Sequence, residues 1–280
     1  CTKAEIHDVY PLKQGLTNLS CHFATNDGEY VYRHPGVGTE LLVNRRSEYA
    51  ALKKAKELGL DDTFIHEDPE RGWKISKFVS NAKQPDPHIA AQMAQMMKIC
   101  RTLHESGAQV ETEFDFYKEA KRYESLLLEK GPIDIPGYWE MAAEVDRLEE
   151  YVRADKAPKC LCHNDFFYLN FLIDEANKYY LIDWEYAGMS DYANDFGTCC
   201  VCCELNANEI DTALDAYFDR KATPGERAHN YAHIALAGWC WYLWALLKEA
   251  EGDFVGEWLY IYYNYGREYL TKALALYEEA

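Results

Sequence analysis

The change of hydrophobic period near residue 80 constrains the fold of this 280-residue chain more than any other feature. Before that point apolar and polar positions alternate between Gly, Asn and Asp turns, a pattern typical of short strands. The predicted strands are residues 6–12, 19–24, 30–33, 63–66 and 73–79. One amphipathic helix over residues 42–58, with Gly59 as its C-cap, interrupts them. The first part of the chain is therefore expected to be a small antiparallel sheet with one helix.

After a polar, proline-containing stretch the periodicity becomes helical. The predicted helices are residues 89–104, 116–129, 138–153, 194–205, 210–218, 226–249 and 257–278. We expect an α+β protein of two lobes. They are an N-terminal lobe over residues 1–80 and a helical C-terminal lobe over residues 88–280, joined by a linker over residues 81–87.

The charge balance excludes some classes of partner. A net charge of −18 argues against sequence-independent binding of nucleic acid or of anionic membranes, because both need clustered Lys and Arg. The longest apolar run, residues 234–247, is too short to cross a bilayer of about 30 Å. No secretory signal pattern opens the sequence, so a small-molecule partner and a cytoplasmic location are expected.

The 10 cysteines do not form a spaced pairing pattern. Four of them are crowded between Cys199 and Cys203, which suits a buried helix in a reducing compartment better than a disulfide framework. Cys160, Cys162 and His163 could be metal ligands, but no second pair stands at zinc-site spacing, and alternation along a strand explains the cysteines equally well.

Two short apolar runs, residues 170–173 and 179–182, flank a polar turn over residues 174–178 and predict a hairpin. The hairpin would bring Asp165 and Asn170, which precede the first strand, close to Asp183, which follows the second. Oxygen ligands from an Asn and an Asp suit Mg²⁺ that carries phosphate oxygens. This arrangement indicates phosphoryl transfer.

The spacing of His163, Asp165 and Asn170, followed by Ile182-Asp183, resembles the catalytic loop and metal-binding aspartate of the protein-kinase-like fold. The sequences His-Asn-Asp and Ile-Asp-Trp-Glu-Tyr-Ala-Gly are similar to the corresponding motifs of choline and ethanolamine kinases, especially the bacterial Lic-type choline kinases. These enzymes are relatives of aminoglycoside phosphotransferases. A literal Asp195-Phe196-Gly197 opens a predicted helix and stands too far along the chain to meet Asn170, so the metal is assigned to Asp183.

The resemblance implies a two-lobed kinase-like fold and ATP-dependent phosphorylation of the choline hydroxyl. It implies that Asp165 orients that hydroxyl and accepts its proton, while Asn170 and Asp183 hold Mg²⁺ ions bridging the ATP phosphates. His163 would support the backbone of the loop. By the same resemblance these three residues, Asp165, Asn170 and Asp183, form the catalytic set.

The nucleotide contacts implied by the resemblance lie in the first lobe. Gly15, Thr17 and Asn18 match the family's phosphate loop in the turn between the first two strands. Arg33 ends the third strand where protein kinases carry Lys, and Glu48 on the next helix is its expected partner. An alternative is that Arg33 and Glu48 form only a surface ion pair worth under about 1 kcal/mol.

Substrate choice is expected to come from aromatic residues. Trp241 and Trp244 stand at i and i+3 on one predicted helix and match the Trp-x-x-Trp of choline kinases, where indole faces bind a quaternary ammonium. Tyr186 and Asp195, with Tyr260 or Tyr262 on the last helix, are the other expected substrate contacts. Paired Trp residues are also common in cores, and Asp195 could simply cap a helix.

Two rival functions stay open at this stage. One is a kinase for another amine-bearing alcohol, such as ethanolamine or an aminoglycoside, although several ammonium groups would call for several carboxylates. The other is a nucleotide-binding pseudokinase, which the intact set of catalytic residues counts against.

Overall fold

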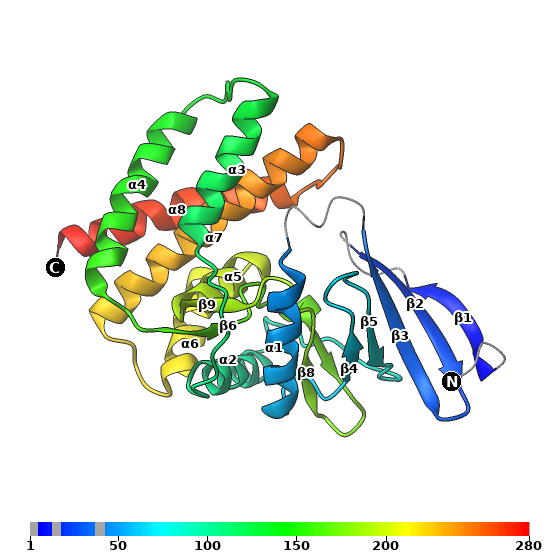
Figure 1. Ribbon diagram of the computed structural model, residues 1–280. Coiled ribbons are helices and arrows are strands. Elements are labelled where there is room, and N and C mark those ends of the chain that lie inside the picture. The colour runs from blue at the N-terminus through cyan, green and yellow to red at the C-terminus, as the bar shows by residue number, and fades with distance from the viewer. Residues whose placement is uncertain (1–4, 13–17, 37–42, 280) are drawn as a thin grey trace. The chain divides into compact units, whose positions relative to one another are not determined.

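The computed structural model describes residues 5–12, 18–36 and 43–279, which divide into two compact units (Figure 1). The first unit comprises Cys1–Pro85, Val110–Thr112 and Leu169–Gly188, and the second comprises Asp86–Gln109, Glu113–Tyr168 and Met189–Ala280. The units differ from the predicted lobes mainly in Leu169–Gly188, which the sequence placed with the helical lobe and which packs with the sheet.

The first unit contains a five-stranded antiparallel sheet in the order β1-β2-β3-β5-β4. Its strands are β1 (His7–Leu12), β2 (Asn18–Thr25), β3 (Gly28–Pro35), β4 (Phe64–Glu67) and β5 (Lys74–Lys77). All five predicted strands are present, and their ends differ from the prediction by a few residues.

The register of this sheet aligns three charged residues. Arg33 on β3 lies opposite Lys74 on β5, and Lys74 lies opposite Glu67 on β4. Residues directly opposite one another in an antiparallel sheet share a face. Arg33, Lys74 and Glu67 are therefore neighbours on one face although they are far apart in the sequence.

Helix α1 (Arg45–Glu57) begins three residues later than predicted and ends within one residue of the predicted end. The Asn44 side chain accepts a hydrogen bond from the Ser47 backbone N–H, and Gly59 has a φ of +71° just past the helix. The buried face of the helix carries Glu48 together with Ser47, Ala51, Leu52 and Ala55. A carboxylate buried among small and apolar side chains requires cationic partners.

The predicted hairpin is confirmed as β7 (Phe171–Ile173) paired with β8 (Tyr179–Leu181). The Asp174 side chain accepts from the Lys178 backbone N–H and closes the turn. A backbone hydrogen bond of 2.9 Å from Ile182 to the Asn170 carbonyl extends the pairing beyond the strands. Asn170 therefore lies beside the chain segment that carries Asp183.

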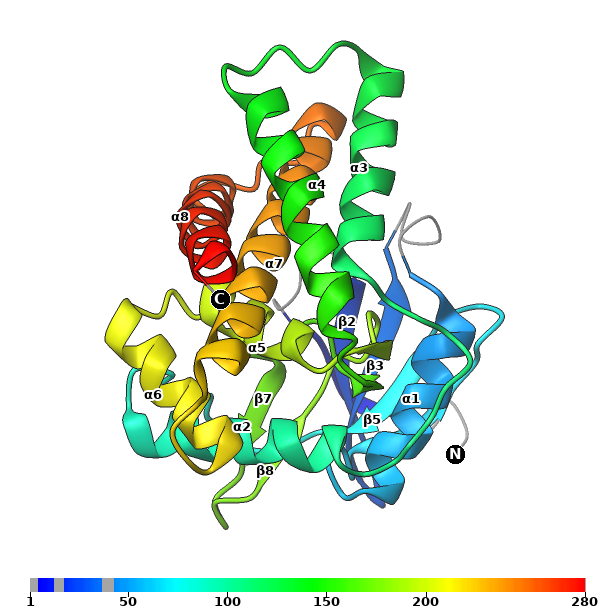
Figure 2. The ribbon, with the colours of Figure 1, turned by 90° about the vertical axis from the view of Figure 1, so that its left-hand side faces the viewer.

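The second unit is mainly helical, as predicted. Its helices are α2 (Ala90–His104), α3 (Phe116–Lys130), α4 (Tyr138–Asp155), α5 (Ala193–Cys202), α6 (Ala207–Phe218), α7 (Pro224–Glu251) and α8 (Trp258–Glu278). Figure 2 shows α7 running among α3, α4 and α8. Most of α7 is buried on all sides, which explains its nearly continuous apolar sequence.

Close helix packing depends on glycine at two positions. A Cβ on Gly238 of α7 would lie 2.5 Å from the backbone nitrogen of Gly266 on α8. A Cβ on Gly197 of α5 would lie 2.4 Å from the backbone oxygen of His233 on α7. Any larger side chain at either position would push the two backbones apart.

The sequence did not predict that β6 (Lys159–Cys162) would pair with β9 (Gly188–Asp191), two short strands that precede the His163–Asp165 loop and α5. The alternation of Cys160 and Cys162 is compatible with a strand, but β9 has the sequence Gly-Met-Ser-Asp, and with one large apolar side chain it shows no apolar pattern. Within the described part of the chain, no helix is long and apolar enough to cross a membrane.

Candidate active site

Arg33 is the centre of a charged cluster in the first unit. Its guanidinium donates to Glu48 on α1 and to Asp183 after β8. Lys74 lies 3.1 Å from the Glu48 carboxylate and 3.9 Å from that of Asp183. The predicted pairing of Arg33 with Glu48 is therefore present, and with both side chains buried it is not a surface ion pair.

Two further residues extend this cluster. Arg45 Nη1 lies 2.6 Å from a Glu48 oxygen and 3.5 Å from a Glu185 oxygen. The side-chain amide of Asn18, which belongs to the predicted phosphate loop, donates a 3.0 Å hydrogen bond to the Glu185 carboxylate. Gly15 and Thr17, the other members of that loop, lie outside the described residues.

Burial and neighbouring charges shift the pKa values of the cluster in opposite directions. Burial alone would raise the pKa of Glu48, but Arg33, Lys74 and Arg45 outweigh it and hold that pKa below its usual range. Burial, with Asp183 adding to it, raises the pKa of Glu185. Glu48 is thus the permanent anion that keeps the basic side chains in place.

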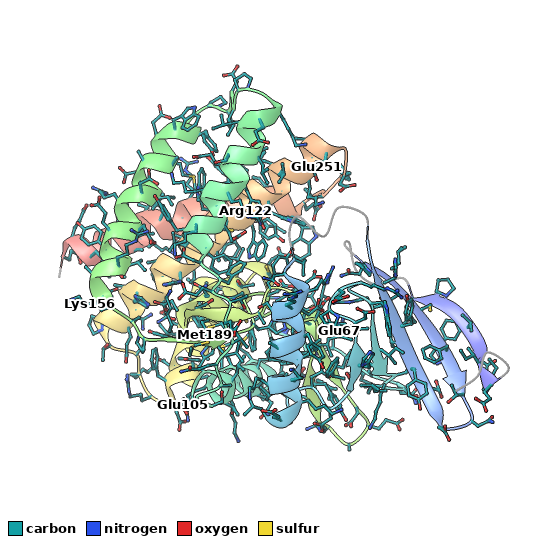
Figure 3. The ribbon with its side chains drawn as sticks, viewed as in Figure 1. Glu67, Glu105, Arg122, Lys156, Met189 and Glu251 are labelled. Atoms are coloured by element: carbon teal, nitrogen blue, oxygen red, sulfur yellow. The ribbon has the colours of Figure 1, made fainter. Side chains whose placement is uncertain are left out.

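Glu67 occupies the β4 end of the charged row and is labelled in Figure 3. It is 1 % exposed, and within the described residues neither carboxylate oxygen has a hydrogen-bond partner. Burial, followed by the nearby charge of Glu48, raises its pKa to about 8. At pH 7 Glu67 is therefore protonated and uncharged. The three basic groups, Arg33, Arg45 and Lys74, then face three acids that can carry negative charge, Glu48, Asp183 and Glu185.

We expect Glu67 to make the protein less stable as pH rises. An acid with a pKa near 8 when folded and near 4.5 when unfolded binds more protons in the folded state, so the free energy of unfolding falls between these values. Replacing Glu67 by Gln should remove this slope, which can reach about 1.4 kcal/mol per pH unit. Urea denaturation from pH 5 to pH 8 measures it.

Glu70→Gln is the matched control, because Glu70 is exposed in the connection between β4 and β5. It should retain the wild-type pH dependence. A stability difference between Glu67→Gln and wild type that is constant with pH would show that Glu67 is ionised in the folded protein throughout this range.

Asn170 and Asp183 are adjacent through the hairpin backbone, as predicted. Asn170 is buried, and the Asp183 side chain is about one-third exposed. Asp183 has a φ of +66°, a conformation that costs energy for a non-glycine residue and is often found where a side chain must point in a functional direction. An amide and a carboxylate oxygen of this kind are suitable ligands for Mg²⁺.

The loop that carries Asp165 belongs to the second unit, where α5 holds it. The Asp195 carboxylate accepts from the backbone N–H groups of His163 at 2.9 Å and Asn164 at 2.6 Å. Its third partner is His104 Nε2 at 2.9 Å. The Asn164 backbone has a φ of +64°, so these bonds fix an unfavourable conformation one residue before Asp165.

This geometry changes the role that we assign to Asp195. We predicted a substrate contact, yet the side chain has no exposed surface and its charge is neutralised by three internal donors. Asp195 is a positioning residue for the His163–Asp165 loop. The Asp195-Phe196-Gly197 triplet lies in α5, which confirms that it is not the strand-ending metal motif.

Aromatic side chains on α7 and α8 lie in the same unit as Asp165. The rings of Trp241 and Trp244 meet edge to face at 6.3 Å, and both are mostly buried. On α8, Tyr260 is 69 % exposed, whereas Tyr262 is buried within electrostatic reach of Asp165, which contributes to the raised pKa of Tyr262 after burial and Cys202. Of the two predicted candidates on this helix, Tyr262 is therefore the one that we retain.

Trp258, at the start of α8, also lies beside this aromatic group, although no sequence motif marks it. Its ring lies 5.6 Å from that of Tyr262 and 6.4 Å from that of Phe167, two residues after Asp165. Tyr186, the remaining predicted substrate contact, is buried in the first unit.

Comparison with known proteins establishes the class. Residues 8–229 match the model of the phosphotransferase enzyme family, so the chain belongs to this family. The choline kinase LicA from Streptococcus pneumoniae superposes with a TM-score of 0.82 and 28% identity over 95% of this chain and 94% of that one. Spectinomycin phosphotransferase APH(9)-Ia has the same fold, with a TM-score of 0.58 at 14% identity over 97% of this chain and 93% of its own.

The curated relatives of the chain include LicA proteins and choline kinases. Protein LicA of Haemophilus influenzae is 24% identical over 279 residues, covering 95% of this chain and 78% of the relative. Probable choline kinase 1 of Arabidopsis thaliana is 27% identical over 227 residues, covering 72% of this chain and 61% of the relative. The comparisons confirm the kinase-like fold and the resemblance to choline and ethanolamine kinases. They also confirm the enzyme class, which is a small-molecule phosphotransferase with an alcohol acceptor.

Proposed function

We propose that this protein transfers the γ-phosphoryl group of ATP to the hydroxyl of choline, giving phosphocholine and ADP. The observation that carries the proposal is the cluster in which Arg33 bonds both Glu48 and Asp183, with Asn170 beside Asp183. In kinase-like phosphotransferases this set binds nucleotide phosphates. The relatives named as choline kinases supply the choice of acceptor.

The charges in the first unit support binding of a polyphosphate. Arg33, Arg45 and Lys74 are held within one buried network, and the proton on Glu67 limits the opposing negative charge. Strong donors that are already positioned stabilise phosphate oxygens without reorganisation during the reaction. We assign Arg33 to the ATP phosphates, with Asn18, Gly15 and Thr17 as the loop over them.

Asn170 and Asp183 are the residues that we propose to hold Mg²⁺, because both offer hard oxygen donors at one end of the hairpin. Bound Mg²⁺ would neutralise charge that develops on the transferred phosphoryl group. Asp165, five positions before Asn170 on the chain, is proposed to orient the choline hydroxyl and to accept its proton.

The choline ammonium is assigned to Trp241 and Trp244, with Tyr186 and Tyr262 as further contacts. A quaternary ammonium offers no N–H, so aromatic faces are its strongest neutral partners. The acidic chain, with a net charge of −18, also favours approach of a cation.

Replacing Trp244 by Ala is expected to raise the KM for choline about 10- to 100-fold, because a desolvated cation–π contact and its apolar area are lost. The KM for ATP should change less than about twofold. Trp244→Phe should restore much of the loss because it retains a π face. Steady-state kinetics with each substrate varied in turn measure both constants.

Trp139→Ala is the matched control, since Trp139 is half-exposed on α4 and should leave both constants unchanged. Equal changes of the two KM values in Trp244→Ala would show that Trp244 is a packing residue only.

The assay that tests the proposed acceptor measures ADP formation with choline, ethanolamine and kanamycin as separate substrates. We expect the highest kcat/KM with choline. Turnover of kanamycin alone would assign the protein to antibiotic modification, and turnover of ethanolamine alone would make the acceptor the hydroxyl of an alcohol that carries a primary amine.

A further inference from the structure

A cluster of two histidines and one aspartate lies in the second unit, apart from the residues assigned to catalysis. His229 and His233 are four residues apart on α7 and share a face, while Asp191 ends β9. His229 Nε2 lies 3.0 Å from one oxygen of Asp191, and His233 Nε2 lies 3.6 Å from the other. Both imidazoles are buried, at 5% and 4% side-chain exposure.

Hydrogen bonds on the far side of each ring determine which nitrogens face Asp191. His229 Nδ1 lies 2.7 Å from the Asp155 carboxylate, and His233 Nδ1 lies 2.8 Å from the Asn194 side-chain oxygen. Both partners accept, because the Asn194 amide nitrogen donates elsewhere, to Asn164. Each Nδ1 therefore carries a proton, and each Nε2 faces the Asp191 carboxylate, where it can hold a second proton or, once that proton is lost, a metal ion.

This arrangement leaves one buried atom unexplained. Within the described residues His233 Nε2 has no hydrogen-bond partner, although it is sealed from solvent and aimed at the Asp191 carboxylate. Its 3.6 Å separation from the Asp191 oxygen is too long for a good hydrogen bond. A cation bound between the three side chains, in place of the ring proton that His229 shares with Asp191, would give every ligand atom a partner.

We propose that His229 Nε2, His233 Nε2 and the Asp191 carboxylate bind a divalent transition-metal ion of the Zn²⁺ class. Two ligand atoms of a tetrahedral zinc ion, each about 2.0–2.1 Å from it, are separated by about 3.3 Å. The two observed separations of 3.0 Å and 3.6 Å bracket that value. Two imidazoles with a carboxylate favour zinc over Mg²⁺, which prefers oxygen ligands.

The surroundings fit such a site. Metal-bound histidines usually donate their other N–H to a carboxylate or amide oxygen, the role that Asp155 and Asn194 have here. Tyr277 donates to Asp155 and fixes it in turn. Asp191 keeps one-fifth of its side chain exposed, which leaves an entry path and a position for a water ligand.

The proposed ion would join three elements at one point. Asp191 belongs to β9 and both histidines to α7, while Asn194 of α5 contacts His233 and Asn164. Asn164 is the residue before Asp165. A metal here would therefore stabilise the residues that hold the loop carrying Asp165. It is distinct from the Mg²⁺ that we assign to Asn170 and Asp183.

Two other groups of possible ligands among the described residues are less suitable, since both depend on His104. Its ring nitrogens already bond Tyr217 at 2.8 Å and Asp195 at 2.9 Å. One of these groups includes Cys160 and Cys162, so a metal bound there would have thiolate ligands and can be recognised by spectroscopy.

The test uses the whole protein after chelation and dialysis, titrated with Zn²⁺ or Co²⁺ without nucleotide. We expect one ion per chain, a higher Tm, and a cobalt spectrum that lacks thiolate charge transfer. His233→Gln should weaken Zn²⁺ binding at least about 100-fold, because losing only an outer partner costs 10- to 100-fold. Exposed His88 provides the control, and His88→Gln should bind Zn²⁺ like wild type.

Three results would overturn the proposal. They are no bound ion at one equivalent, equal affinity in His233→Gln and wild type, and a thiolate band in the cobalt spectrum. Absence of binding would leave His229 as an imidazolium between Asp155 and Asp191. Asp183→Asn should still bind Zn²⁺, so the outcome is separate from that of the proposed kinase function.

Discussion

Replacing Asp165 by Ala is expected to lower kcat about 10²- to 10⁴-fold, the contribution of a positioned general base, and to leave the KM for ATP nearly unchanged. Asp165 is partly exposed, and its loop is held by Asp195 through backbone groups that the substitution keeps. The variant should therefore fold with a Tm close to that of wild type. Choline-dependent ADP formation and thermal unfolding, measured on the same preparation, check both statements.

Asp134→Asn is the control for Asp165, since Asp134 is exposed in the connection between α3 and α4. It should retain wild-type activity. If Asp165→Ala retained more than about one-tenth of wild-type kcat, the residue would not be the base, because that loss is too small for a positioned proton acceptor.

Replacing Asp183 by Asn is expected to lower kcat at least about 10³-fold, because a metal ligand supplies several kcal/mol of charge stabilisation in the transition state. Asn tolerates the positive φ of this position and keeps the side-chain volume, so the substitution changes the charge and little else. The concentration of Mg²⁺ needed for half-maximal activity should also rise. Titration of activity with Mg²⁺ at saturating ATP measures both effects.

Glu175→Gln gives a comparison on the same hairpin, where Glu175 is exposed in the turn. It should leave the Mg²⁺ dependence unchanged. An Asp183→Asn variant with normal kcat and normal Mg²⁺ dependence would assign the metal elsewhere, with Glu185 as the nearest carboxylate of the same segment.

The secondary structure could be predicted because each element has a clear hydrophobic period. The sheet strands, the hairpin and the seven helices of the second unit follow alternation or helical spacing, and α7 shows how far this extends. The β6–β9 pair could not be predicted, because β9 has one large apolar side chain and no apolar pattern marks it as a strand. The grouping of Leu169–Gly188 with the sheet also depends on long-range contacts, such as the hydrogen bond from Leu181 to the Leu60 carbonyl.

The candidate site was only partly predictable, for a related reason. Arg33, Glu48 and Asp183 were found because a family resemblance assigned them, and the structure brings them together. Lys74 and Glu67 belong to no motif, and only the register of β3, β5 and β4 places them in the same row.

Asp195 and Tyr260 show the limit of motif reasoning. Residue spacing indicated their types and approximate places, but not which way each side chain points. Asp195 is directed at the backbone of the loop, and Tyr260 is directed at solvent, with Tyr262 buried in its place. Direction on a helix depends on packing against neighbours that sequence spacing alone does not reveal.

Phosphorus NMR of the protein with MgATP and choline is the sharpest test of the proposed phosphoryl transfer. It follows the γ-phosphoryl group itself. We predict that the γ resonance of ATP is replaced by one phosphomonoester resonance of phosphocholine, in equal amount to the ADP formed. Release of inorganic phosphate without a phosphomonoester, or unchanged ATP, would contradict the assignment of this chain as a choline kinase.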